Sequence, residues 1–257
     1  MTESPGAAPD ERNVNCIQAS QIYGSVIQAH TIYGDVITQK PSSTSGREIV
    51  HRDERAAILM ARLVSEWEQR VELSRWDNWT SSLLQPTPTI DREQFKRFSE
   101  TSVWLATRSW PPSGFSKTKH AFDVFTQVWG DLMSLIDSEF HTHPIIPNRF
   151  CLREKHKEID YDPALYKQYG DEFDMNCELI HHLVIHATAA ANLLCDAIRV
   201  ELDSSYRFEE GDLKVTRGLD MNLKFTHICP KYIERQEGES LYPGLKELRE
   251  FVKENAS

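Results

Sequence analysis

The sequence lacks the short motifs that indicate most enzyme classes. It contains no Walker-type phosphate loop, no Gly-x-Gly-x-x-Gly run and no Gly-x-Ser-x-Gly turn, the patterns that bind nucleotides or present a nucleophilic serine. Its five cysteines form no Cys-x-x-Cys pair, so a thiolate metal site or a redox dithiol has no support. The sequence therefore predicts no catalytic residue and no cofactor.

Positive charge is also scarce. The chain has 29 Lys and Arg residues against 39 Asp and Glu residues, a formal net charge of −10, and no run of basic residues. Nucleic-acid binding depends on basic patches that neutralise phosphates, so no nucleic-acid partner is expected. We expect protein partners instead.

Long apolar runs are missing too. Nowhere do eighteen apolar residues follow one another, and the first residues include acidic residues and prolines where a signal peptide needs basic residues and an apolar core. An odd number of cysteines without a pairing pattern is typical of free thiols in a reducing compartment. These features predict a cytoplasmic protein. The cysteines are Cys16, Cys151, Cys177, Cys195 and Cys229.

What the sequence does contain is a tandem repeat. Residues 17–26 are followed at once by residues 27–36, and the two units match at seven of ten positions. β-Branched and aromatic residues with almost no charge and no proline are the composition of segments that stack into cross-β structure. The repeat is therefore predicted to be the assembly site. Its shared residues are Ile17, Gln18, Ala19, Ile22, Tyr23, Gly24 and Val26, then Ile27, Gln28, Ala29, Ile32, Tyr33, Gly34 and Val36.

The length of the repeat unit suits stacking. Because ten is an even number, a side chain that points to one face of a strand in the first unit keeps that face in the second. Gln18 can then lie over Gln28 as an amide ladder, while Gly24 and Gly34 permit the bend of an arch. Two rungs alone leave both edges unpaired, so a single copy is expected to be marginal until other copies complete the stack.

The repeat resembles the short amyloid signalling motifs of bacteria and fungi and, more distantly, the RIP homotypic interaction motif of animal necroptosis proteins. The resemblance covers residues 15–39. Bacterial motifs have the form Gln-Ala-Gly-x-Ile-x-Gly-x-Val, which residues 18–26 and 28–36 follow except at Ser20 and His30, where the motif has its first glycine. In such families the motif occurs on an NTP-driven receptor and on an effector, and amyloid templating passes the signal between them.

This resemblance implies partners and a pathway. The expected partners are other copies of the chain and other proteins with the same repeat, such as a receptor ATPase. The expected pathway is prokaryotic immunity or programmed cell death, with membrane contact only after assembly.

A β-hairpin or two solenoid rungs inside an ordinary globular domain is the alternative structure for the repeat. The flanks favour a tethered segment, because residues 1–12 are rich in Pro, Gly, Ala and charge and residues 40–46 read Lys-Pro-Ser-Ser-Thr-Ser-Gly, as linkers do. We predict a disordered stretch at 1–13, the repeat at 14–38, a linker at 39–47 and a mostly helical domain at 48–257.

Apolar residues at three- and four-residue spacing predict helices in the first part of that domain. A long helix should also follow Asp162-Pro163, an N-cap and a first helical residue, with a break allowed at Gly170. The earlier helices are expected at 48–84, from an N-cap at Asp91 to about Trp110, and from Ser116 to Phe140, with a loop at 141–147.

The long helix is predicted to be the core of the domain. Between Leu183 and Cys195 nearly every residue is apolar or small, as in a helix with neighbours on several sides. A membrane span is the alternative, but His186 and Asn192 interrupt the stretch and it is short.

After this helix the pattern changes. Alternating residues near 206–208, 213–215 and 223–228 predict a small antiparallel β-meander, and Pro243 opens a final helix. The expected fold class is α+β, mainly α: a helical bundle at 48–203, then the β-meander and a C-terminal helix at 204–257, with a flexible N-terminal tail that carries the repeat.

One set of side chains could carry chemistry in the helical domain. Glu178, His182 and His186 lie one turn apart on one face of the long helix, with His181 beside them. Carboxylates and imidazoles at this spacing bind metals in helical bundles. Hydrogen-bonded helix histidines are the plainer interpretation, because no His-Glu-x-x-His and no second Glu-x-x-His is present. Candidate ligands from elsewhere are Asp174, His120, His141 and His143.

Two functions remain. In the first, the chain is a non-enzymatic signalling or effector module that the repeat assembles. In the second, the helical domain is an enzyme, metal-dependent or of another kind, and the repeat is a β segment that oligomerises it. Structural roles are expected for Cys177, Cys195 and the six tryptophans.

Overall fold

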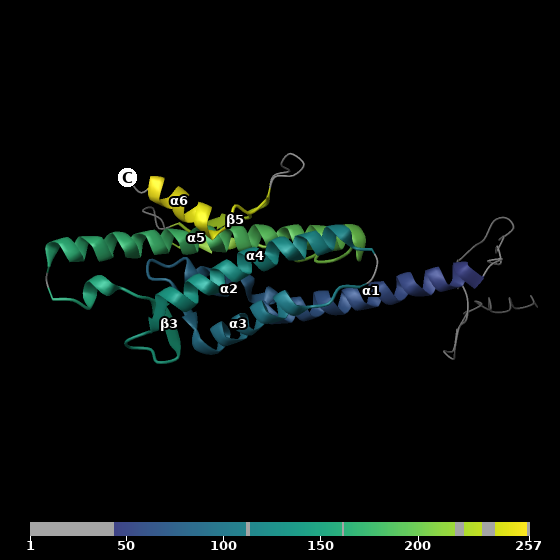
Figure 1. Ribbon diagram of the computed structural model, residues 1–257, viewed down its shortest axis with the longest axis horizontal. Helices are drawn as coiled ribbons and strands as arrows, with labels where there is room; N and C mark the ends of the chain where they lie inside the picture. The colour runs from purple at the N-terminus through teal and green to yellow at the C-terminus, as the bar shows by residue number, and fades with distance from the viewer. Residues whose placement is uncertain (1–43, 112–113, 161, 219–223, 233–239, 256–257) are drawn as a thin grey trace, which may run out of the picture. The chain divides into compact units, whose positions relative to one another are not determined.

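The computed structural model describes residues 44–111, 114–160, 162–218, 224–232 and 240–255. The chain divides into two units, residues 1–42 and residues 43–257, and every described element belongs to the second unit (Figure 1). The helices are α1 (Thr44–Arg70), α2 (Trp76–Leu83), α3 (Arg92–Thr107), α4 (Ser116–Glu139), α5 (Pro163–Glu201) and α6 (Leu245–Asn255). The strands are β1 (Thr89–Asp91), β2 (Phe140–Thr142), β3 (Arg149–Leu152), β4 (Val215–Arg217) and β5 (Thr226–Ile228), and the 3-10 helices are η1 (Leu73–Arg75) and η2 (Lys155–Lys157). A mainly helical α+β unit with a C-terminal helix confirms the predicted fold class.

Two long antiparallel helices, α4 and α5, form the centre of this unit. Glu201 at the end of α5 accepts hydrogen bonds from the backbone N–H groups of Lys117 (3.0 Å) and Thr118 (2.9 Å) at the start of α4. Near the other end, Asn176 Nδ2 donates to the Glu139 carboxylate at the end of α4 (3.2 Å). Figure 1 shows the two helices side by side, with α6 against α5.

Helix α5 begins and continues as one element. The Asp162 carboxylate accepts hydrogen bonds from the N–H groups of Ala164 and Leu165, which confirms the predicted N-cap, and the helix passes through Gly170 without a break. Among the described residues α5 is the one helix long and apolar enough to cross a membrane by length and composition, yet 67% of that apolar window is buried inside the unit. Core packing therefore accounts for its apolar character, as predicted.

Aromatic side chains fill the core beside α4. The Trp129 ring stacks on Phe125 with centroids 5.3 Å apart and meets Phe98 and Trp79 edge-on at 5.0 and 5.8 Å. Its indole Nε1 donates to the Phe98 backbone carbonyl (3.1 Å). Such ring pairs add to the stabilisation from buried area. The packing role predicted for the tryptophans is confirmed for the four that are buried, Trp67, Trp76, Trp79 and Trp129.

The helix predicted at 48–84 is wrong in its extent and its continuity. Helix α1 already begins at Thr44, so residues 44–47 are helical and not a linker. It ends before Glu72, which takes a left-handed conformation with φ 51° and accepts a hydrogen bond from Gln94 Nε2 on α3 (2.8 Å). Hydrophobic periodicity did not reveal this break because apolar residues on both sides of it are buried, namely Val71, Leu73 and Trp76.

The loop predicted at 141–147 belongs in part to a sheet. Strand β3 lies between β1 and β2 in an antiparallel sheet, with Phe150 opposite Ile90 on one side and Thr142 on the other. Each strand has three or four residues, and runs this short show no clear alternation. Residues 143–148 alone form the connection between β2 and β3.

The predicted β-meander is a two-stranded ladder, because residues 206–208 form a turn and not a strand. Strands β4 and β5 pair antiparallel, with Thr216 opposite His227. Asn192 on α5 fixes the chain just before β4: its Oδ1 accepts from the Leu213 N–H (2.7 Å), and its Nδ2 donates to the Leu213 and Pro230 carbonyls (2.9 Å each). A buried side chain distant in sequence thus determines where the ladder lies.

The C-terminal helix α6 forms shortly after Pro243, as predicted. Its start is capped from another helix, since Asp131 on α4 accepts hydrogen bonds from the Leu245 N–H (3.1 Å) and the Tyr242 hydroxyl (2.6 Å). Leu248 and Val252 are buried. This arrangement holds α6 against α5, and a groove lies between these two helices.

Candidate functional site

The residues predicted to assemble, between Ile17 and Val36, lie outside the described residues. Their cross-β structure stays a prediction, as do the disordered stretch at 1–13 and the repeat boundaries at 14–38. In the described unit, the candidates for chemistry are the groove between α5 and α6, the histidines and the cysteines.

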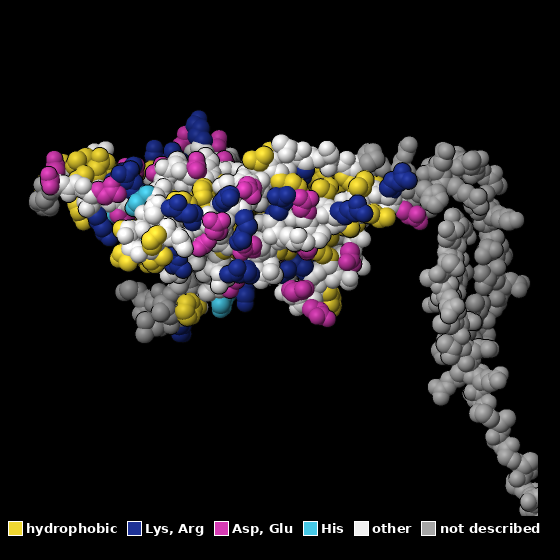
Figure 2. Space-filling view, turned by 90° about the horizontal axis from the view of Figure 1, so that it is seen from below, with side chains coloured by type: hydrophobic (Ala, Val, Ile, Leu, Met, Phe, Trp, Pro, Cys, Tyr) yellow, Lys and Arg dark blue, Asp and Glu magenta, His cyan; other side chains and the backbone are white. Residues whose placement is uncertain are grey.

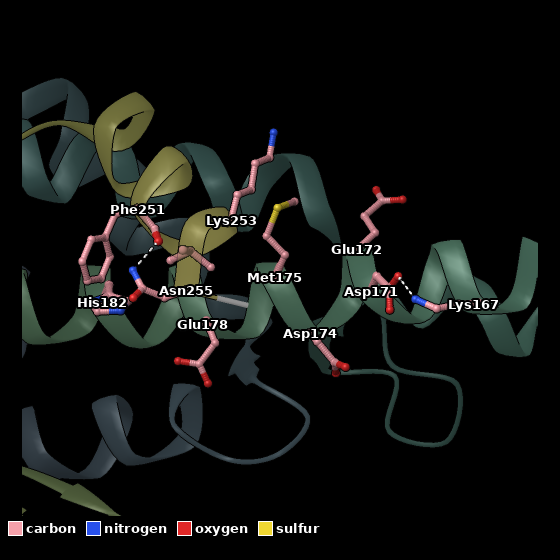
Figure 3. Close-up of a pocket in the computed structure, with 11 residues that line it drawn as sticks. Lys167, Asp171, Glu172, Asp174, Met175, Glu178, His182, Phe251, Lys253 and Asn255 are labelled. Carbon is pink, nitrogen blue, oxygen red and sulfur yellow. Dashed lines mark hydrogen bonds and ion pairs between the residues drawn. The ribbon is translucent and has the colours of Figure 1, made fainter. Parts of the chain in front are cut away.

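The groove between the first half of α5 and α6 has a volume of about 710 Å³. Figure 3 shows Asp174 and Glu178 pointing away from Glu172 and Lys253, so the charged groups do not converge on one point. The apolar lining is Met175, Phe251 and Val252, and the polar lining is Lys167, Asp171, Glu172, Asp174, Glu178, His182, Lys253 and Asn255.

Two of the carboxylates in the groove are already paired. Lys167 Nζ lies 2.6 Å from Asp171, and Lys155 Nζ lies 2.5 Å from Glu172. The hydrogen bond to Glu172 raises the pKa of Lys155 above its ordinary value. Exposed pairs of this kind contribute little stability, but they leave a surface of mixed charge without a converging acid and base.

His181 is half-buried, and both of its ring nitrogens are shielded from solvent. Its ring nitrogens find no hydrogen-bond partner among the described residues, and Nδ1 lies 3.8 Å from the Glu178 carboxylate. Burial lowers the pKa of His181, Glu178 opposes this shift, and Arg217 adds to it. The imidazole is therefore neutral at pH 7.

His182 and His186 share a face of α5, as predicted, but aromatic rings occupy that face. His182 packs edge-on against Phe251 of α6 with ring centroids 5.6 Å apart. His186 Nδ1 lies 3.2 Å from the Tyr232 hydroxyl, and its ring lies 5.3 Å from the Tyr242 ring. Both histidines thus join α5 to the C-terminal segment.

The other candidate ligands lie apart, except for Asp174, which shares the groove with Glu178 and His182. His120 is exposed near the start of α4, which meets the far end of α5, roughly 28 Å along the helix from His182 at about 1.5 Å per residue. His141 and His143 belong to the hairpin of β2 and β3. Within the described ranges, no three His, Cys, Asp or Glu side chains are grouped so that they could hold a metal ion.

The cysteines on α5 are buried thiols, which confirms their predicted structural role. Burial raises the pKa of Cys177 and of Cys195, to about 12 in each case. For Cys177 the charges of Asp174 and Glu178 act in the same direction. A thiol with this pKa is protonated at pH 7 and is not a nucleophile.

These thiols should react slowly with alkylating reagents. In a chain carrying Cys16→Ser, iodoacetamide at pH 8 is expected to modify the exposed Cys229 first and the buried Cys151, Cys177 and Cys195 only after denaturation, because burial both raises the pKa and blocks access. Mass spectrometry of the alkylated peptides gives the order. Modification of Cys177 or Cys195 in the folded chain as fast as Cys229 would contradict the packing of α5.

Sequence reasoning missed one exposed feature, the tip of the hairpin of β2 and β3. Ile145 is 83% exposed and Ile146 is 42% exposed, and Pro144 and Pro147 flank them. Turns are normally built from Gly, Pro, Asn, Asp and Ser, so an isoleucine pair inside a predicted loop was the available signal.

No protein-family model matches the chain, and neither a curated protein nor a solved structure shows significant similarity to it.

Proposed function

We propose that the chain is a signalling or effector protein that assembles through homotypic, amyloid-like stacking of residues 17–36. The tandem repeat carries this proposal, because seven of ten positions are identical in two consecutive units. In a packed core each position faces different neighbours, whereas units that stack on one another favour identical side chains in register.

Stacking of the repeat is expected to be cooperative. One chain supplies two rungs, which are marginal alone, but the open edge of an existing stack presents unpaired N–H and C=O groups to the next copy. Gln18 and Gln28 then extend a ladder of side-chain amides along the stack. The partners are other copies of this chain and other cytoplasmic proteins that bear the repeat, including a receptor ATPase in a prokaryotic immunity or cell-death pathway.

In this proposal, assembly of the repeat brings many copies of the helical unit close together. Two observations support this role. The chain divides at residue 42, and the second unit has a core of its own, in which Trp67, Trp129 and Leu183 are fully buried. A unit with a complete core can be displayed along a fibril without unfolding.

A metal-dependent enzyme is the alternative function. It would need ligands that converge, and the described residues supply no group of three. Glu178 is largely exposed, the ring nitrogens of His181 are shielded and have no hydrogen-bond partner in the described unit, and His182 packs on an aromatic ring. These surroundings favour structural histidines, so assembly remains the proposal.

A peptide of residues 13–40 tests the proposal. We expect thioflavin-positive fibrils with a strand spacing of about 4.7 Å in fibre diffraction. A control peptide in which residues 17–36 are scrambled should stay soluble, because it loses the ten-residue period that lets the two units of each chain stack in register. A repeat peptide that stays monomeric and unstructured, with and without seeds, would contradict the proposal.

A further inference from the structure

An apolar tip projects from the hairpin of β2 and β3. Six consecutive residues, 144–149, are exposed, and the isoleucines Ile145 and Ile146 expose 83% and 42% of their surface. The hairpin lies at the lower left of the described unit in Figure 1, where β3 is labelled. Figure 2 looks onto that lower side and shows hydrophobic side chains at its left end, with Lys and Arg side chains beside them.

The tip is held in one conformation by its own hydrogen bonds. The N–H groups of Ile145 and Ile146 both donate to His143 Nδ1, at 3.2 and 3.1 Å. The His143 N–H donates to the Arg149 carbonyl (2.8 Å), and the Arg149 N–H donates to the Ile146 carbonyl (3.0 Å). Because the loop is already ordered, little conformational entropy would be lost when the isoleucines bind something.

Two arginines flank the base of the tip. The Arg92 guanidinium lies over the Phe150 ring, 4.8 Å from its centroid, and its Nη2 donates to Thr142 Oγ1 (2.9 Å). Arg149 is exposed. Neither arginine has an ion-pair partner among the described residues. Asp91 stands opposite Arg149 in the sheet, but its carboxylate caps α3.

We propose that this tip inserts into the interface of an anionic lipid membrane and holds the chain there when many copies are clustered. The clustering part rests on the proposed function. A convex apolar tip places isoleucines in the acyl region, while guanidinium groups at its base meet lipid phosphates. A protein partner would need a pocket of matching depth, whereas a lipid surface accepts any protruding apolar tip.

One copy is expected to bind weakly. The tip buries little apolar area, and the net charge of −10 opposes approach to anionic lipid. Salt screens the repulsion between the lipid and charges more than about 8–10 Å away, whereas the isoleucines and arginines of the tip interact with the lipid in direct contact. Linked copies bind with an avidity that exceeds the single affinity by roughly a hundredfold or more, so clustering should convert transient contact into stable attachment.

The test uses the full chain with biotin at its C-terminus, either free or bound in fours to streptavidin, and flotation with vesicles of phosphatidylcholine alone or with phosphatidylglycerol. We expect the tetramer to bind the phosphatidylglycerol vesicles at least about a hundredfold more tightly than the free chain does. Ile145→Ser should weaken tetramer binding about tenfold or more. The double variant Arg92→Gln, Arg149→Gln should weaken binding to vesicles that contain phosphatidylglycerol and should leave binding to vesicles of phosphatidylcholine unchanged.

Phe208→Ser is the matched control, because Phe208 is also 83% exposed but lies in the turn after α5, away from the hairpin. It should leave tetramer binding unchanged. Equal binding by the Ile145→Ser tetramer, equal loss in the Phe208→Ser tetramer, or no binding of the parent tetramer would each overturn the membrane proposal. Streptavidin brings copies of the full chain together through their biotin groups and does not depend on stacking of residues 17–36. A failure of these residues to form fibrils is therefore a separate result.

Discussion

The full chain carrying Gln18→Lys and Gln28→Lys is expected to stay soluble and to be excluded from assemblies of the unmodified chain. In a stack, each rung places one lysine about 4.7 Å from the next, where two unit charges repel by roughly 3 to 4 kcal/mol at an effective dielectric constant of about 20. This repulsion recurs with every copy added. On a surface hairpin each lysine would reach water, and the change would cost little.

Light scattering and co-sedimentation with unmodified chain measure the assembly, and thermal unfolding measures the helical unit. The matched control is Ala7→Lys with Ala8→Lys, which adds the same formal charge outside the repeat, where the lysines do not recur in register along a stack. This control should assemble. If the Gln18→Lys, Gln28→Lys chain assembles normally, or if its helical unit melts at a lower temperature, residues 17–36 are ordinary structure and templating is wrong.

Replacing Trp129 by alanine is expected to lower the free energy of unfolding of the helical unit by about 3 to 5 kcal/mol. The ring is fully buried, stacks on Phe125, and meets Trp79 and Phe98 edge-on. Its removal leaves a cavity and takes away the hydrogen bond that the indole N–H donates to the Phe98 carbonyl. Because the total stability of a domain is about 5 to 15 kcal/mol, this loss is a large fraction.

Chemical denaturation followed by circular dichroism measures this change. Trp129→Phe should cost less, since a ring remains between Phe125 and Phe98, and Val103→Ala should cost under about 0.5 kcal/mol, since Val103 is 65% exposed on α3. A Trp129→Ala chain as stable as the Val103→Ala chain would mean that these aromatic rings do not form the core.

Helices α4 and α5 and their order could be predicted from the sequence because local chemistry specifies them. Asp162 caps α5 through its own carboxylate, and Asp91 caps α3 in the same way. The apolar stretch from Leu183 to Cys195 exceeds what one helix face needs, which indicates neighbours on several sides. These signals depend on residues a few positions apart.

The break after α1 and the small sheet could not be predicted because contacts distant in sequence decide them. Glu72 is held in its left-handed conformation beside Gln94 of α3, and β3 exists because β1 and β2 pair on its two sides. Likewise the chain entering β4 is fixed by Asn192 of α5 and not by its own turn residues. Periodicity contains none of this information.

The candidate site divides in the same way. Helical spacing correctly put His182 and His186 on one face, but the rings that meet them, Phe251, Tyr232 and Tyr242, come from the C-terminal segment. The shielding of the His181 ring nitrogens depends on tertiary packing and left no signal in the sequence. By contrast, the role proposed for the repeat rests on its sequence alone, because residues 17–36 lie outside the described residues.

Hydrogen–deuterium exchange of the full chain before and after assembly tests the central claim most directly. If residues 17–36 stack between copies, their backbone N–H groups should exchange rapidly in the soluble chain and become strongly protected in the assembly. Protection in α4 and α5 should stay the same, because the helical unit is carried unchanged. Assemblies in which residues 17–36 still exchange rapidly, or in which protection of α4 and α5 is lost, would contradict assembly through the repeat.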